Sequence, residues 1–160
     1  MPSPQANDDT FWEHVLDVVL PLLKRFEGFR ATAYPDPAGQ DKLYSIGYGH
    51  QIKPGDGLTQ ASRIDETKAT ELLRRDVASR IDELKRDVVV VLSVNQAAAL
   101  LSFAYNVGAG AFRTSTLLKL LNAGDVVGAA AQFARWDKVG GVPNASLASR
   151  RSQERALFAT

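Results

Sequence analysis

Two carboxylic acids, Glu27 and Asp36, are the residues of this sequence whose types and spacing best suit acid–base chemistry. Glu27 follows Phe26 at the end of a helical pattern, and Asp36 lies nine positions further on, between two prolines. Taken singly, Glu27 is typical of a solvated surface charge and Asp36 of a turn. As a pair they match what hydrolysis of a glycosidic bond requires: one carboxyl group kept protonated by a poorly solvated site and a second that stays ionised.

Two further polar residues, His50 and Asp76, need a different explanation. A lone histidine invites a metal interpretation, but no cluster of ligand residues surrounds it in the sequence and there is no cysteine. Asp76 falls on the apolar stripe of a predicted helix, four residues after Leu72, where a carboxylate needs a partner. Arg80, four residues further along the same helix, is one candidate for that partner.

The elements that must position these residues follow from periodicity and from turn residues. Glycines and prolines crowd residues 28–57, and residues 43–46 resemble a strand, so this stretch predicts an irregular hairpin region with tight turns. Apolar residues at helical spacing predict a helix over residues 11–26. Pro21 inside it indicates either a kink or the first residue of a second helix.

The rest of the chain is predicted to be helical. Asp65 can cap a helix whose apolar stripe consists of Ala69, Leu72, Leu73, Val77, Ile81 and Leu84. Ser93 and Gln96 form a capping box for a helix that closes at Gly108. Further helices are expected over residues 115–121, 126–135 and 147–158, with Gly124 and the glycines at 140 and 141 as breaks.

Length and composition restrict the class of protein. The 160 residues suit one compact domain, and 19 Lys and Arg against 18 Asp and Glu argue against a nucleic-acid binder. The most apolar N-terminal run, residues 15–23, is much shorter than the roughly 20 residues of a membrane span, and no signal peptide accompanies it. The absence of cysteine fits a reducing cytosol, and residues 1–8 are expected to form a loose tail.

The order of several motifs resembles one known family. Residues 26–30 (FEGFR), 33–37 (AYPDP) and 45–50 (SIGYGH) closely resemble the signature of the phage-type lysozymes, glycoside hydrolase family 24. Residues 95–108 look like that family's central helix, and residues 150–158 look like its C-terminal helix. The segments 115–118, 121–124 and 133–136 follow in the expected order. The resemblance covers roughly residues 18–158.

This resemblance implies a mainly helical α+β fold, with a small N-terminal β-hairpin lobe and a larger helical lobe flanking a cleft. Residues 18–160 would form one catalytic domain, and residues 1–17 an extension. The implied reaction is hydrolysis, with inversion, of the β-1,4 bond between N-acetylmuramic acid and N-acetylglucosamine in peptidoglycan. The resemblance implies a monomer that needs no metal or cofactor. It also implies that the protein neither binds nucleic acid nor inserts stably into a membrane. The enzyme would act from the host cytoplasm on periplasmic peptidoglycan once the inner membrane is permeabilised.

The same resemblance assigns roles to individual residues. It makes Glu27 the general acid and Asp36 the carboxylate that positions the attacking water. Ser45 stands where the family usually has a threonine whose hydroxyl helps hold that water, and serine lacks the stiffening methyl group. The stretch 37–45 also looks about three residues longer than usual. His50 is implied to reach Asp76 as a structural ion pair that joins hairpin to helix.

Three residues match positions that line or support the sugar cleft in relatives: Tyr105, Asn106 and Trp136. Arg150 is a fourth expected substrate-binding residue, because an arginine can hold an anionic, peptide-bearing cell wall. Each also has a simpler interpretation. Trp136 and Tyr105 can be core residues, Asn106 can belong to a helix C-cap, and Arg150 and Arg151 can form a solvated face.

A second function class stays open at this point. The chain could be a non-catalytic module that uses the lysozyme fold to bind cell wall or a protein partner. The longer loop and Ser45 favour this alternative, whereas the acid pair and the Gly-Tyr-Gly sequence at residues 47–49 oppose it.

Overall fold

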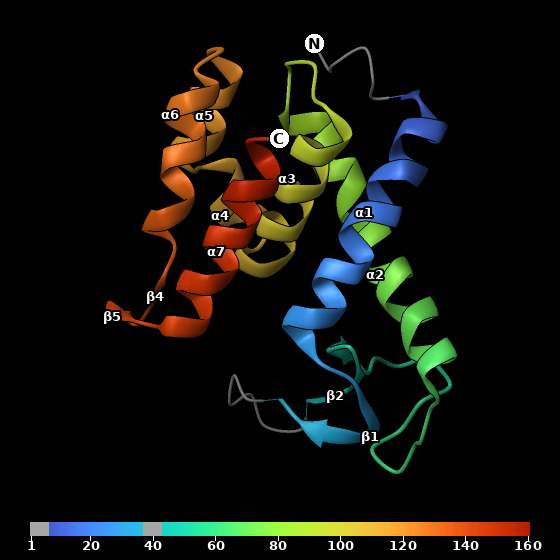
Figure 1. The fold of residues 1–160 in the computed structure, drawn as a ribbon. Helices are drawn as coiled ribbons and strands as arrows, with labels where there is room; N and C mark the ends of the chain where they lie inside the picture. The colour runs from blue at the N-terminus through green and yellow to red at the C-terminus, as the bar shows by residue number, and fades with distance from the viewer. Residues whose placement is uncertain (1–6, 37–42) are drawn as a thin grey trace. The chain divides into compact units, whose positions relative to one another are not determined.

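The computed structural model describes residues 7–36 and 43–160, which fall into two compact units. Residues 20–78 form what we call the sheet unit, and residues 1–19 together with 79–160 form the helical unit. Their elements are drawn in Figure 1. A mainly helical α+β fold with a small N-terminal sheet, as the sequence predicted, is therefore confirmed.

Helix α1 (Asp9–Glu27) begins at a cap. The Asp8 Oδ1 atom accepts a hydrogen bond from the backbone N–H of Phe11 at 3.0 Å, so Asp8 has a structural role that a loose tail would not give it. The expectation for residues 1–6 lies outside the described residues. Pro21 stands inside one continuous helix, so it does not start a second one. The helix also continues without a break past residue 17, where the family resemblance begins.

Helix α2 (Glu66–Asp87) begins where the sequence predicted. Asp65 Oδ1 accepts a hydrogen bond from the backbone N–H of Lys68 at 2.8 Å. All six residues of the predicted stripe are at most 7% exposed: Ala69, Leu72, Leu73, Val77, Ile81 and Leu84. Their burial confirms that the apolar periodicity identified the packed face of this helix.

The sheet is a three-stranded antiparallel meander of β1 (Arg30–Pro35), β2 (Tyr44–Gly47) and β3 (His50–Gln51). The Cα register pairs Tyr34 with Ser45 and Ser45 with Gln51. Gly47 opens the turn between β2 and β3 with a φ of +68°. A Cβ there would lie 3.0 Å from the Cβ of Ala69 on α2, so both the backbone conformation and the close packing require glycine.

The helical unit is centred on α3 (Val94–Val107), which carries the predicted capping box of Ser93 and Gln96. Helices α4 (Ala109–Arg113), α5 (Thr116–Asn122), α6 (Val126–Gln132) and the short 3-10 helix η2 (Phe133–Arg135) follow it. The C-terminal helix α7 (Ala145–Phe158) packs along α3 (Figure 1).

One element of this unit differs from expectation. The two glycines at 140 and 141 do more than break a helix, because they form the turn of a ribbon between β4 (Lys138–Val139) and β5 (Val142–Pro143). Both have positive φ, +55° and +81°, as a two-residue hairpin turn of the I′ type requires. With two residues on each side, the ribbon is too short for strand periodicity to be visible in the sequence.

Candidate active site

Glu27 is the last residue of α1 and is half-buried. Its carboxylate lies over the turn between β2 and β3: an added Cβ at Gly49 would be 3.4 Å from Glu27 Oε2. Gly49 has a φ of +79°, a conformation that side chains other than glycine rarely adopt. The turn therefore presents bare backbone to the Glu27 carboxylate.

Asp36 directly follows β1 and is also half-buried. Its backbone N–H donates to the carbonyl oxygen of Leu43 at 2.9 Å, which extends the β1–β2 pairing to this residue. The side-chain amide of Gln51 on β3 donates to Asp36 Oδ2 at 3.4 Å. The sequence did not indicate Gln51, because the contact depends on the strand register.

The charges of Glu27 and Asp36 both influence the pKa of the Tyr34 phenol. Burial raises the pKa of Tyr34, the Arg30 guanidinium lowers it, and the negative charges of Glu27 and Asp36 raise it further. Arg30 is stacked 4.6 Å above the centre of the Tyr34 ring. Since both carboxylates act on one hydroxyl, the fold of the sheet unit brings the two predicted acids into the same neighbourhood.

Ser45 lies in the middle of the sheet and is 6% exposed. Residues directly opposite each other on antiparallel strands point to the same face. Ser45 therefore shares a face with Tyr34 on one side and with Gln51 on the other. The predicted loop extension falls on residues 37–42, which lie outside the described residues.

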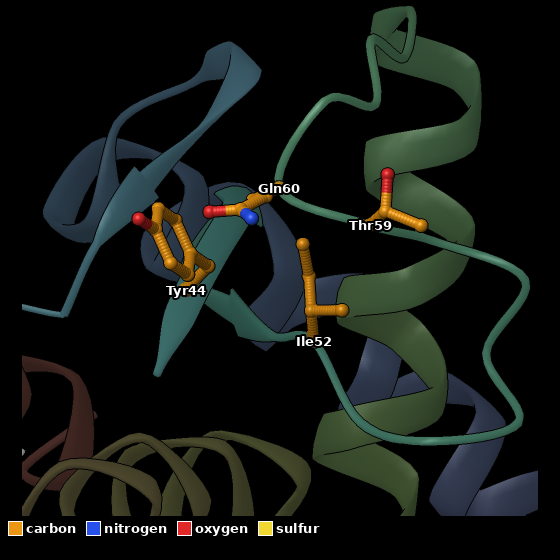
Figure 2. A pocket seen from close by; sticks show the side chains of 4 residues that line it. All are labelled: Tyr44, Ile52, Thr59 and Gln60. Atoms are coloured by element: carbon orange, nitrogen blue, oxygen red, sulfur yellow. The ribbon is translucent and has the colours of Figure 1, made fainter. Parts of the chain in front are cut away.

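The opposite face of the same hairpin contains an open hollow of about 580 Å³. Tyr44 and Ile52 line it together with Thr59 and Gln60 from the following loop (Figure 2). The backbone N–H of Ile52 donates to the carbonyl of Tyr44 at 2.8 Å, which holds these two residues side by side. Because Tyr44 and Ile52 each directly neighbour Ser45 or Gln51 in sequence, strand alternation places the hollow on the face away from Ser45.

His50 is buried between two carboxylates. Its Nδ1 lies 2.7 Å from Asp76 Oδ2, the contact that the family resemblance implied, and its Nε2 lies 2.9 Å from Asp56 Oδ2. Asp56 was not expected. A hydrogen bond from the backbone N–H of Lys53 lowers the pKa of Asp56, and the bond from His50 lowers it further. Arg80, the alternative partner for Asp76, donates to Glu83 at 3.2 Å.

The predicted substrate-binding residues belong to the helical unit. Tyr105 and Trp136 are both half-buried. The Trp136 ring is edge-on to the Phe103 ring, with 5.4 Å between the ring centres. Asn106 is exposed, and its Oδ1 accepts a hydrogen bond from Arg151 Nη2 at 2.8 Å. The side chain of Asn106 thus links α3 to α7.

Arg150 corrects the sequence analysis. Arg150 and Arg151 are 6% and 1% exposed, so the interpretation that they form a solvated face is wrong. Arg150 donates to Ser102 O at 3.0 Å and to Glu154 Oε2 at 3.3 Å. This burial and these contacts make Arg150 part of the α3–α7 packing.

The acid at the centre of that packing is Glu154, which is fully buried. Ser102 Oγ donates to its Oε2 at 2.6 Å, and Arg151 Nε lies 2.6 Å from its Oε1. Burial raises the pKa of Glu154, whereas the neighbouring arginines and Ser102 lower it. Burial likewise lowers the pKa of Arg151. We call Arg150, Arg151 and Glu154 the buried triad.

Two features are absent from the described residues 7–36 and 43–160. Within them, three or more His, Asp or Glu side chains do not gather in a way that could hold a metal ion. In the same part of the chain, we found no helix with the length and apolar character needed to cross a membrane.

The fold and this pair of acids define a class, the lysozyme-like proteins. The model of the phage lysozyme family matches residues 24–154, so the chain belongs to the phage lysozyme family. The endolysin of Bacillus phage PZA is 44% identical over 137 residues, which are 86% of this chain and 52% of that protein. The chain thus spans about half the length of the Bacillus phage endolysins that it matches.

Solved structures agree with the family. A mutant of P22 lysozyme matches with a TM-score of 0.79 and 39% identity, covering 89% of this chain and 96% of the other. The muramidase domain of SpmX from Asticaccaulis excentricus matches with a TM-score of 0.80 and 33% identity, covering 89% of this chain and 95% of that domain.

Proposed function

We propose that this chain is a muramidase that hydrolyses the β-1,4 bond between N-acetylmuramic acid and N-acetylglucosamine in peptidoglycan. The observation that carries the proposal is that Glu27 and Asp36 both lie close enough to Tyr34 for their charges to raise its pKa, in a member of the phage lysozyme family. The relative described above as a muramidase domain supports the same reaction.

Glu27 is the proposed general acid. It lies at the end of α1, half-buried against the turn between β2 and β3, and a carboxyl group in this place can donate a proton to a glycosidic oxygen bound beside it. Asp36, hydrogen-bonded by Gln51, is the proposed base that activates water, and Ser45 holds that water. Inversion follows from this division of roles, because a water attacks from the face opposite the leaving group.

Tyr105, Asn106 and Trp136 are retained as proposed contacts of the glycan. We do not retain Arg150, because its guanidinium is buried against Ser102 and Glu154. We further propose that the enzyme acts as a monomer, without cofactor, on periplasmic peptidoglycan after the inner membrane has been breached.

The deciding experiment compares wild type with Glu27→Gln on outer-membrane-permeabilised cells and on purified peptidoglycan. Glutamine keeps the size of the side chain but cannot donate the proton, so lysis is expected to fall by roughly 10²–10⁴-fold. Binding to insoluble peptidoglycan is expected to persist. The matched control is Glu71→Gln, an exposed acid on α2, which should lyse cells like wild type.

The experiment also distinguishes the enzyme from a binding module. A Glu27→Gln variant that clears cells as fast as wild type contradicts the assignment of the acid. A wild type that binds peptidoglycan and releases no fragments contradicts the muramidase proposal and supports a non-catalytic module.

A further inference from the structure

The short strand β3 has two polar residues with opposite surroundings. His50 is held by Asp76 at 2.7 Å and by Asp56 at 2.9 Å, so both of its ring nitrogens are engaged. Gln51 follows it directly, and strand alternation turns the Gln51 side chain to the other face. The contacts of His50 therefore also fix the direction in which Gln51 projects.

That direction brings Gln51 to the proposed base. Its Cα partner across the sheet is Ser45, so the Gln51 amide and the Ser45 hydroxyl share one face. From there the amide donates to Asp36 Oδ2 at 3.4 Å. Hydrogen bonds of catalytic groups are often long without substrate and shorten when it binds. An amide group, a hydroxyl group and a carboxylate group thus meet on one face of the sheet unit.

The chemistry of an amide suits this place. The Gln51 side chain has two N–H donors and no charge, so it can orient a carboxylate without forming an ion pair with it. A lysine or arginine would neutralise Asp36 and weaken it as a base. With an amide partner, Asp36 keeps its negative charge available to a water molecule.

We infer that Gln51 is a positioning residue, whose amide orients the Asp36 carboxylate towards the water that Asp36 and Ser45 bind. This inference rests on the proposed function, since it assigns Gln51 a role in that same reaction. The competing possibility is that Gln51 only packs in the sheet, in which case its polar atoms have no influence on the rate.

Two variants of nearly equal size test the inference. Gln51→Met keeps the length of the side chain and removes the donor, whereas Gln51→Glu keeps the shape and can donate only while its new carboxyl is protonated. We would measure kcat and KM on soluble glycan oligomers of the two amino sugars, across the pH range in which carboxyl groups titrate. Gln60→Met and Gln60→Glu are the matched controls, because Gln60 is exposed and lines the hollow on the opposite face.

For Gln51→Met we expect kcat to fall roughly 10–150-fold, the worth of one hydrogen bond to a charged group, with KM little changed and an equal loss at every pH. For Gln51→Glu we expect most of kcat at low pH and a steep decline as pH rises, since the ionised carboxyl cannot donate and repels Asp36. A residue that merely packs would not produce this difference in pH profile. The Gln60 variants should keep the wild-type profile.

A wild-type kcat in Gln51→Met, or an equal loss at every pH in Gln51→Glu, would overturn the inference while leaving the muramidase proposal intact. A wild type that cleaves no glycan overturns the muramidase proposal, and the role of Gln51 with it. The contact can also be followed without turnover, in a Glu27→Gln background, by the ¹³C signal of the Asp36 carboxyl. That signal should move on Gln51→Met and stay in place on Gln60→Met, and an unmoved signal would show that the amide does not hold Asp36.

Discussion

The stability of the buried triad is predicted to depend on the negative charge of Glu154. Glu154 is the carboxylate that faces both Arg150 and Arg151, and all three residues are at most 6% exposed. Glu154→Gln preserves shape and a hydrogen bond to Ser102 but leaves two guanidinium groups buried with their shared counter-charge removed. Breaking a buried pair from one side typically costs roughly 3–5 kcal/mol, because the remaining charge stays desolvated.

For a domain of this size, each kcal/mol lowers Tm by about 2–4 °C. We therefore expect Glu154→Gln to melt roughly 6–20 °C below wild type in thermal unfolding followed by circular dichroism. The control is Glu71→Gln, which removes an exposed pair with Lys68 at 3.3 Å and should cost at most about 1 kcal/mol.

A third protein tests the cause of the loss. Replacing the whole triad by apolar residues (Arg150→Met, Arg151→Met, Glu154→Leu) removes every buried charge together. Such replacements are often neutral or stabilising, so this variant should melt above Glu154→Gln despite carrying three substitutions. The reasoning is refuted if Glu154→Gln loses less than about 1 kcal/mol, or if the triple variant is the less stable of the two.

Three smaller predictions concern the sheet unit and the start of α1. Asp76→Asn should lower the free energy of unfolding by about 1.5–3 kcal/mol, because it removes the carboxylate that bonds to His50. The activity of the folded variant should stay near wild type. An unchanged denaturation midpoint would contradict a stabilising role for this pair. Because the pKa of Asp56 is lower in the folded state, its stabilisation is complete above the ordinary aspartate range of about 4 and is lost as pH falls through the folded-state pKa. The difference in stability between wild type and Asp56→Asn should therefore shrink in acid, and urea titrations that show a constant difference would oppose this. Asp8→Ala should cost about 0.5–2 kcal/mol by removing the cap on Phe11 N–H, and thermal melts that match wild type would contradict this role of Asp8.

Much of the fold could be predicted from local rules. The stripe on α2 and the capping box at Ser93 depend on residues three or four positions apart, so they are visible in the sequence before any tertiary contact exists. Pro21 shows the limit of such rules. A proline at that position is compatible with a kink or with a new helix, and packing of the residues on both sides decides that α1 continues.

The sequence by itself determined the candidate acids, Glu27 and Asp36, because their residue types and the motifs around them can be read directly along the chain. Only the tertiary structure decided which groups surround them. Gln51 reaches Asp36 through the register of β3 on β2, and Asp56 reaches His50 through a turn. Those contacts join residues from separate elements, and neither hydrophobic periodicity nor capping specifies them.

The two arginines of α7 illustrate the same division most clearly. Charged residues are almost never fully buried without a partner, so the sequence favoured a solvated face for Arg150 and Arg151. The partner was present in the sequence as Glu154, three and four residues further on. A solvated pair at that spacing has the same pattern as a buried one, and only the packing of α7 against α3 removes water from it. Spacing determined which charges could meet, and tertiary packing determined the dielectric environment in which they do.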